Sequence, residues 1–245
     1  MKKEKIYIYG KHALMEALLN CPQAIDKVFL SLRGDLELEK IIKDKNIAIG
    51  TLNSAEVEKD AVHQGVIAKI NLDKLLIKYE DFIKTTQISS KISFVFLGGL
   101  HDPHNVGAII RSAAAFGISG VLIPKKEQAP ITGAVAKVSA GMLFRIPIIE
   151  VKNSIETIKD LKNREFSIYG LEGTSNNYLD KEVFNTPTVF VMGNESRGLD
   201  KDIEELCTKK IAIPMNKRCE SLNVAVSASV TFYEWSKNHK DSLKD

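Results

Sequence analysis

The sequence predicts an α/β protein built on a mainly parallel sheet with helices on both faces. Short runs of β-branched and aromatic residues alternate with helical stretches along most of the 245-residue chain, a pattern typical of such sheets. The unusual polar and glycine-bearing strings come directly after predicted strands. Because ligands bind outside the carboxyl ends of parallel strands, we expect these strings to meet at one rim.

The first seventy or so residues read as one compact α/β unit. Its predicted strands and helices are, in order, a strand at 5–10, a helix at 12–20, a strand at 27–31, a helix at 35–45, a strand at 46–52, a short helix capped by Ser54 and a strand at 65–70. Residues 72–91 turn polar and carry no strong strand signal. We therefore predict an N-terminal domain over 1–75, a linker over 76–91 and a second domain over 92–245.

The second domain continues the alternation. Its predicted strands lie within 92–100, 120–124, 145–150, 166–173, 188–195 and 210–214, and its helices begin near Asn105, cover 132–139, start at Asn153 or Ser154, cover 200–206 and run from Leu222. The strings GGLHDPHN, GLEGT, GNESRG and PMNKRCES each follow one of these strands. Four loops should thus converge on one rim.

Composition excludes several classes of protein. With 44% hydrophobic and 27% charged residues the chain can bury a core. A net charge of +3, from 34 basic and 31 acidic side chains, requires any nucleic-acid surface to be a local patch. Three scattered cysteines favour a reducing, cytoplasmic location. No signal peptide is evident, and no run approaches the ~18 apolar residues of a membrane span, so we expect a soluble chain with no membrane partner.

The common nucleotide-binding motifs and a metal site are not supported. No GxGxxG follows a strand, and the chain contains no GxxxxGK[ST]. The loops Gly170–Gly173 and Gly193–Gly198 could let the backbone approach a ligand, although such loops are often simple turns. His101 and His104 are not expected to bind metal, because Pro103 breaks helical spacing and no third ligand is near.

The string HDPHNVGAIIRSAAAFG contains two candidate site residues. Asn105 lies where the helix is expected to start, and its side chain could cap backbone N–H groups. Arg111 interrupts an otherwise small and apolar helix, which suggests a buried face. It would then either pair with a structural carboxylate or meet a phosphate or a reacting oxygen.

Two further strings contain the other candidates. Glu195 follows a buried strand in GNESRG, where its carboxylate could hold a ligand or an arginine, or interact with the next helix N-terminus. In PMNKRCESLNVAVS, Ser221 is the expected N-cap and Asn223 the first-turn residue of the last helix. Cys219 has no histidine partner in the sequence, so we do not expect it to be a nucleophile.

Taken together and in this order, the strings resemble the motifs of the SpoU/TrmH branch of the SPOUT RNA 2'-O-methyltransferases. The residues that match are Asn105, Arg111, Glu195, Ser221 and Asn223. The N-terminal strings YGKHALMEALL and HQGVIA are similar to the L30e-like substrate-recognition domain of the subgroup that modifies a guanosine of 23S ribosomal RNA. The resemblance thus implies an L30e-like domain followed by a SPOUT methyltransferase domain.

The resemblance also implies a deep trefoil knot, an exception to the usual un-knotted topology, and a homodimer with the site near the subunit interface. It implies RNA, most readily ribosomal RNA, as substrate and S-adenosylmethionine as cofactor. The five matching residues would be the catalytic set. The cofactor would be bound by Gly170, Leu171, Gly173, Gly193, Ile213, Met215 and Leu222.

The role of Arg111 has two readings. The resemblance nominates it as general base, but an arginine pKa of about 12.5–13.8 makes deprotonation near pH 7 cost roughly 7–9 kcal/mol. A cationic Arg111 that stabilises the forming alkoxide is favoured on energy. Three other functions stay open: a transfer-RNA methyltransferase, a resistance methyltransferase acting on another ribosomal nucleotide, and a non-catalytic ribosome-binding scaffold.

Overall fold

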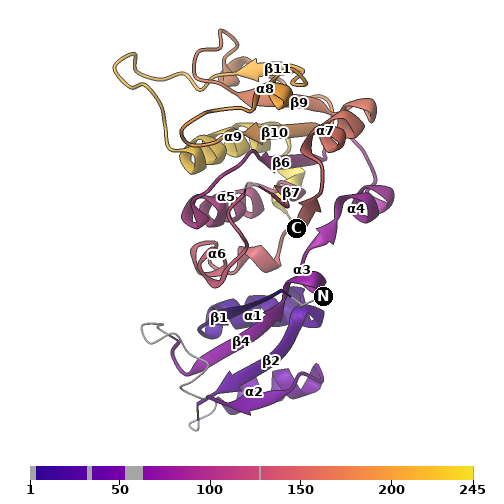
Figure 1. The fold of residues 1–245 in the computed structure, drawn as a ribbon, viewed down its shortest axis with the longest axis vertical. Coiled ribbons are helices and arrows are strands. Elements are labelled where there is room, and N and C mark those ends of the chain that lie inside the picture. Colours follow the sequence, from indigo (N-terminus) through magenta and orange to yellow (C-terminus); the bar gives the residue numbers. More distant parts are fainter. Residues whose placement is uncertain (1–3, 32–34, 53–62, 127, 245) are drawn as a thin grey trace.

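The computed structural model describes residues 4–31, 35–52, 63–126 and 128–244, which form two domains (Figure 1). The predicted Ser54 helix lies outside the described residues. The N-terminal domain contains β1 (Lys5–Tyr9), α1 (Lys11–Asn20), the 3-10 turn η1 (Pro22–Ala24), β2 (Ile25–Leu30), α2 (Leu36–Asp44), β3 (Ile49–Thr51), β4 (Val66–Asn71) and α3 (Leu72–Leu75).

The N-terminal sheet is mixed, in the order β1-β4-β2-β3. β4 runs antiparallel to β1 and β2, and β3 is parallel to β2. Ile6 and Ile8 of β1 belong to one buried cluster with Leu14 and Leu18 of α1, because alternate strand residues face the helices. The sequence-predicted α/β character of this domain is confirmed.

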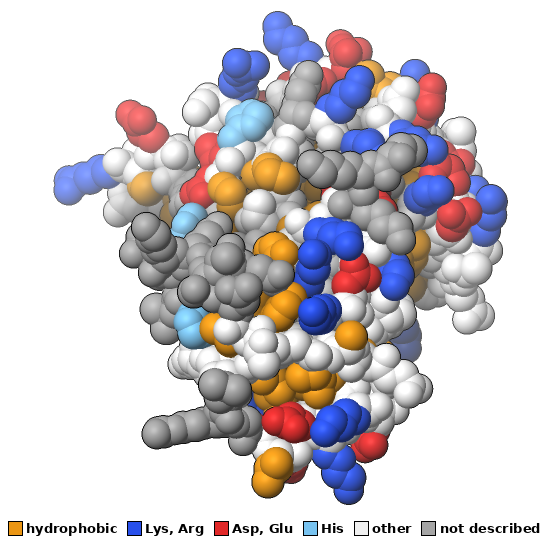
Figure 2. All heavy atoms as spheres, turned by 60° about the horizontal axis from the view of Figure 1, so that its bottom comes forward, with side chains coloured by type: hydrophobic (Ala, Val, Ile, Leu, Met, Phe, Trp, Pro, Cys, Tyr) orange, Lys and Arg blue, Asp and Glu red, His pale blue; other side chains and the backbone are white. Residues whose placement is uncertain are grey.

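The opposite face of this sheet combines lysines with aromatic rings. Lys69 is in register with both Tyr7 and Lys27 on the neighbouring strands. The Lys69 ammonium lies 5.6 Å from the Tyr7 ring centroid, and that of Lys27 lies 4.9 Å from the Phe29 centroid. Both distances suit cation–π attraction. Figure 2 shows the molecule with the N-terminal domain turned forward, where Lys and Arg side chains lie beside hydrophobic ones.

The second domain contains a parallel sheet in the order β11-β9-β10-β6-β7-β8-β5. Its elements are β5 (Ile77–Lys78), α4 (Tyr79–Thr85), β6 (Ser93–Leu97), α5 (Pro103–Ala115), β7 (Gly120–Pro124), α6 (Gly133–Val138), η3 (Met142–Phe144), β8 (Ile148–Val151), α7 (Ser154–Asn163), β9 (Ser167–Leu171), η4 (Leu179–Lys181), β10 (Thr188–Met192), α8 (Lys201–Glu204), β11 (Lys209–Ile211), α9 (Val224–Asn238) and η5 (Lys240–Leu243).

Helices cover both faces of the parallel sheet, as predicted. Residues of α5, α6 and α9 share one buried cluster with alternate strand residues, and those of α4, α7 and α8 share a second cluster with the remaining ones (Figure 1). The central strands β6, β7 and β10 are accordingly buried on both sides. In the described part of the chain, no helix combines the length and apolarity needed to cross a membrane.

The segment 76–91 is more ordered than the linker that the sequence suggested. Ile77 and Lys78 pair in parallel with β8 and add an edge strand to the second sheet. Tyr79 and Ile83 of α4 are buried in the cluster on that side. A two-residue strand has no periodicity to detect, so the polar composition of the segment was misleading.

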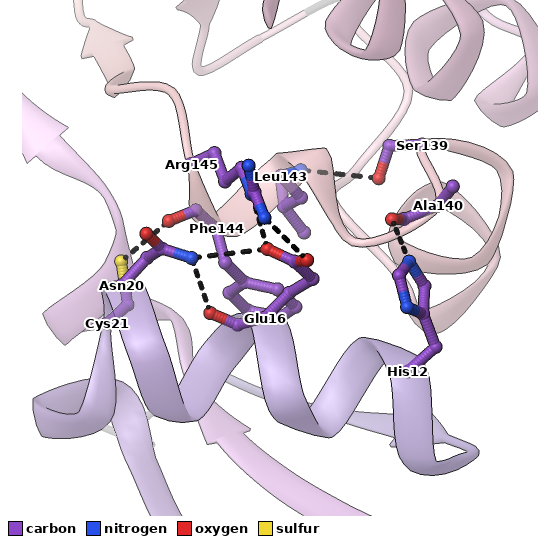
Figure 3. A network of polar contacts seen from close by, with 9 residues as sticks. All are labelled: His12, Glu16, Asn20, Cys21, Ser139, Ala140, Leu143, Phe144 and Arg145. Atoms are coloured by element: carbon purple, nitrogen blue, oxygen red, sulfur yellow. Dashed lines mark hydrogen bonds and ion pairs between the residues drawn. The ribbon is translucent and has the colours of Figure 1, made fainter. Parts of the chain in front are cut away.

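The two domains are joined by a polar contact between α1 and the α6–η3 segment (Figure 3). Arg145 donates from Nε to Glu16 Oε2 at 2.5 Å and from Nη2 to Glu16 Oε1 at 2.9 Å. Asn20 Nδ2 donates to the same carboxylate at 3.2 Å, and His12 Nε2 lies 3.1 Å from the Ala140 carbonyl oxygen. Glu16 is only 6% exposed, so these partners replace the water that its carboxylate lacks.

Candidate active site

Three of the four loops that the sequence predicted to meet at one rim, those that follow β9, β10 and β11, line one cavity, and the loop that follows β6 does not line it. The cavity has a volume of about 620 Å³. This volume is typical of small-molecule sites, which concentrate at the carboxyl ends of parallel strands. The lining combines apolar side chains with the carboxylates of Glu172, Glu195 and Glu220.

Most residues expected to bind a cofactor line this cavity: Leu171, Gly173, Gly193, Ile213, Met215 and Leu222. Gly170 is not among the lining residues. It lies within β9, where an added Cβ would come 2.7 Å from Leu199 Cδ1 and 2.9 Å from Cys207 Sγ. Close packing on the neighbouring elements therefore accounts for a glycine at this position.

A chain of polar contacts joins the three motifs at the cavity edge. Asn223 Oδ1 accepts from the backbone N–H groups of Ala225 and Val226, so its amide nitrogen is free to donate. That nitrogen donates to Asn105 Oδ1 at 3.0 Å, and Asn105 Nδ2 donates to Glu195 Oε1 at 3.1 Å. The helix cap thus fixes the orientation of both amides and directs one of them to the carboxylate.

The caps of the two helices differ from those expected. Asp102 caps α5 by accepting from His104 N at 2.8 Å, with Pro103 in the first helical position, so Asn105 lies inside the first turn. Asn223, and not Ser221, caps α9. Ser221 precedes the helix and lines the cavity. Both asparagine side chains are thereby placed at the rim.

Arg111 lies on an exposed part of α5, in contrast to the buried face expected from its apolar neighbours. Within the described residues its guanidinium has no hydrogen bond or ion pair. It also does not line the cavity that Glu195 and Ser221 line. A structural pairing of Arg111 with a carboxylate is therefore not observed in the part of the chain that the structure describes.

Asn194 is a residue that the sequence analysis missed. Its Nδ2 donates to the Gly99 carbonyl at 2.7 Å, and its Oδ1 accepts from Ser196 N and Arg197 N. An asparagine followed by polar residues and glycine is typical of such a turn. The contacts hold the loop bearing Glu195 against the loop that leads to α5.

Family models match both domains. The model of the SpoU rRNA methylase family covers residues 93–233, and that of RNA 2'-O ribose methyltransferase substrate binding covers residues 7–75. The chain belongs to the SpoU rRNA methylase family. With its substrate-binding module, this SpoU family member is an RNA 2'-O-ribose methyltransferase, as the motifs predicted.

Known proteins are similar to this chain in sequence or in structure along almost its whole length. A protein of Staphylococcus saprophyticus assigned to the TrmH family of tRNA/rRNA methyltransferases is 34% identical over 94% of this chain and 95% of its own. The SpoU methyltransferase AviRb of Streptomyces viridochromogenes, solved with AdoMet, superposes with TM-score 0.81 at 20% identity, covering 97% and 91% of the two chains. An rRNA methyltransferase of Sinorhizobium meliloti superposes with a TM-score of 0.82 at 19% sequence identity, covering 97% of this chain and 88% of its own. These two structures establish the shared fold.

Proposed function

We propose that this enzyme uses S-adenosylmethionine to methylate the ribose 2'-hydroxyl of a guanosine in 23S ribosomal RNA. The observation that carries the proposal is the Glu195–Asn105–Asn223 chain at the edge of the cavity. It places a carboxylate and two oriented amides beside a space of cofactor size. Such groups can position a sugar hydroxyl, and positioning alone can supply several kcal/mol of catalysis.

The cavity residues fit S-adenosylmethionine, which supplies the methyl group from a positively charged sulfonium. Glu172, Glu195 and Glu220 would attract that charge. The apolar side chains of Leu171, Ile213, Met215 and Leu222 would hold the uncharged parts of the molecule, with Gly173 and Gly193 allowing close approach. AviRb, which has the same fold, was solved with this cofactor.

Asn105, Glu195 and Asn223 would orient the ribose, and Ser221 at the rim would contact the RNA backbone. Arg111 would act as a cation that stabilises the negative charge developing on the 2'-oxygen. The proton of that hydroxyl would pass to water. Since Arg111 has no partner in the described part of its own chain, we propose that a homodimer completes the site.

An apolar stripe on α9 supports the homodimer. Val226, Val230 and Tyr233 are spaced four and three residues apart, and are 48%, 36% and 55% exposed. This spacing places them on one face of the helix, and such faces are usually covered in an assembly. Arg111 is on α5, which packs against α9 through a 2.7 Å contact between Ser112 and Ser229 hydroxyls. The trefoil knot stays a prediction of the resemblance.

We propose that residues 1–75 select the RNA and that residues 92–245 carry out the reaction. The substrate-binding match to residues 7–75 and the lysine–aromatic face of the N-terminal sheet support this division. The extra domain favours ribosomal over transfer RNA.

Mapping 2'-O-methyl groups in total RNA from cells with and without the gene tests the proposal. We expect one ribosomal guanosine to lose its methyl group and to regain it when purified protein and S-adenosylmethionine are added. Loss of a transfer-RNA methyl group would contradict the ribosomal assignment. An unchanged methylation map, together with no binding of S-adenosylmethionine in calorimetry, would instead favour a scaffold.

A further inference from the structure

A second cavity lies on the other side of the loop that carries Glu195. It has a volume of about 390 Å³ and opens at the carboxyl ends of β6, β7 and β8. Asn194 and Gly198 line both this cavity and the cofactor cavity, so one loop separates the two. Apolar residues, among them Pro124, Ile155 and Leu199, form part of its wall.

Three cations around this second cavity have no partner among the residues that the structure describes. Lys126, Lys152 and Arg197 line it and are exposed, and within the described residues none of their side chains makes a hydrogen bond or ion pair. They come from three different loops, after β7, β8 and β10. Like charges gathered around one concavity raise its positive potential and favour an anionic ligand.

The other charged residues of the cavity leave this excess in place. Lys125 is paired with Glu150 at 3.2 Å. Asp200 caps α8, where its Oδ1 accepts from Asp202 N at 3.0 Å and Ile203 N at 3.4 Å. Asp202 is the other acidic lining residue that the structure describes. Since the whole chain is only +3, this is a local concentration of positive charge.

We infer that the second cavity binds backbone phosphates of the RNA strand next to the methylated nucleotide. The inference rests on the proposed function and adds the path of the substrate. A strand crossing the loop at 194–198 would present a ribose to Asn105 and Glu195 on one side and its neighbouring phosphates to Lys126, Lys152 and Arg197 on the other. Exposed cations on separate loops suit an extended backbone, whereas recognition of one free phosphate usually relies on converging backbone donors.

The test measures RNA affinity as a function of salt for the full-length double variant Lys126→Ala/Lys152→Ala. The probes are fluorescein-labelled oligouridine RNA and protein-free ribosomal RNA. The control is Lys91→Ala/Lys159→Ala, which removes two exposed lysines that do not line either cavity. Melting curves and S-adenosylmethionine affinity are measured on every variant, so that loss of folding or of the cofactor site is detected separately.

We expect the cavity variant to bind RNA roughly tenfold more weakly and to lose about 1.4 from the slope of log K against log salt, since each single-strand phosphate contact contributes about 0.7. KM for ribosomal RNA should rise while kcat and cofactor affinity stay unchanged. Equal losses of RNA affinity in the cavity and control variants would overturn the inference. It would also be overturned if adenosine monophosphate or inorganic phosphate competed with the RNA at millimolar concentration or below. Failure of the proposed function would look different, because the unsubstituted enzyme would then not methylate ribosomal RNA at all.

Discussion

Asn105 is the residue on which the three motifs meet. Its amide accepts from Asn223 and donates to Glu195, so it transmits the orientation set by the α9 cap to a carboxylate 90 positions further along the chain. Asp102 performs the capping of α5. The side chain of Asn105 is therefore available for the site, and function and capping can be separated by substitution.

Asn105→Ala should lower turnover by about 10²-fold, because misplaced groups lose near-attack geometry, with little change in Tm. Asp102→Ala should lower Tm and leave turnover nearly unchanged. Loss of an N-cap typically costs about 1 kcal/mol of stability, while the hydrogen bonds among Asn223, Asn105 and Glu195 persist. Single-turnover methylation and thermal melting of both variants check this pair. A large fall in Tm for Asn105→Ala with normal turnover would show that Asn105 acts mainly through the helix.

Most residues that the sequence proposed for the site line the cavity or contact a residue that lines it, but their structural roles differ from those expected. Asn and Ser are similar N-caps, so the sequence alone could not decide between Ser221 and Asn223, two positions apart. Arg111 was expected on a buried face, because its apolar neighbours were read without knowing which side of α5 faces the core. Gly170 was predicted from the resemblance as a cofactor residue, and the structure adds that it packs closely against Leu199 and Cys207.

The long, periodic helices and strands were predicted well from the sequence, whereas β5 and α4 within 76–91 were not predicted. β6, β7 and β10 are buried on both sides and are almost entirely apolar. α4 instead is held by a few tertiary contacts. Tyr79 is buried and donates to Asp160 Oδ2 at 2.6 Å, while Arg164 Nε donates to the same oxygen at 2.8 Å.

Tyr79→Phe should destabilise the protein by about 1 kcal/mol near neutral pH, because a hydrogen bond to a carboxylate is lost. Partial burial opposes ionisation of Asp160, but the bonds from Arg164 and Tyr79 prevail and lower its pKa. Because the pKa of Asp160 is lower in the folded than in the unfolded protein, its ionised carboxylate stabilises the fold at pH values above the unfolded-state pKa of about 3.9. This stabilisation is lost as the pH falls through the folded-state pKa. Urea unfolding at pH 7 and pH 3 should show the gap between variant and unsubstituted protein narrowing in acid. Equal gaps at both pH values would attribute the effect to packing.

The N-terminal domain and the second domain are docked directly on each other. Gly133 lies so close to β1 that an added Cβ would be 2.2 Å from the Tyr7 carbonyl oxygen. Gly141 has φ +80°, and a Cβ there would be 2.7 Å from Glu16 Cγ. Along with the Glu16–Arg145 pair, these contacts hold the lysine-bearing sheet and the cofactor cavity in a fixed relation, which suits an enzyme that must bring one nucleotide to one pocket.

Substitutions in the Glu16–Arg145 pair test whether this ion pair holds the two domains together. Arg145→Ala should cost about 2–3 kcal/mol, since it leaves a carboxylate that is only 6% exposed without its cation. Adding Glu16→Gln to that variant should recover much of the loss, because a neutral amide needs no counter-charge. Urea unfolding gives the energies, and hydrogen exchange of α1 and α6 reports undocking. If the second substitution adds a further loss, the contact contributes through packing and the ion pair does not set the domain arrangement.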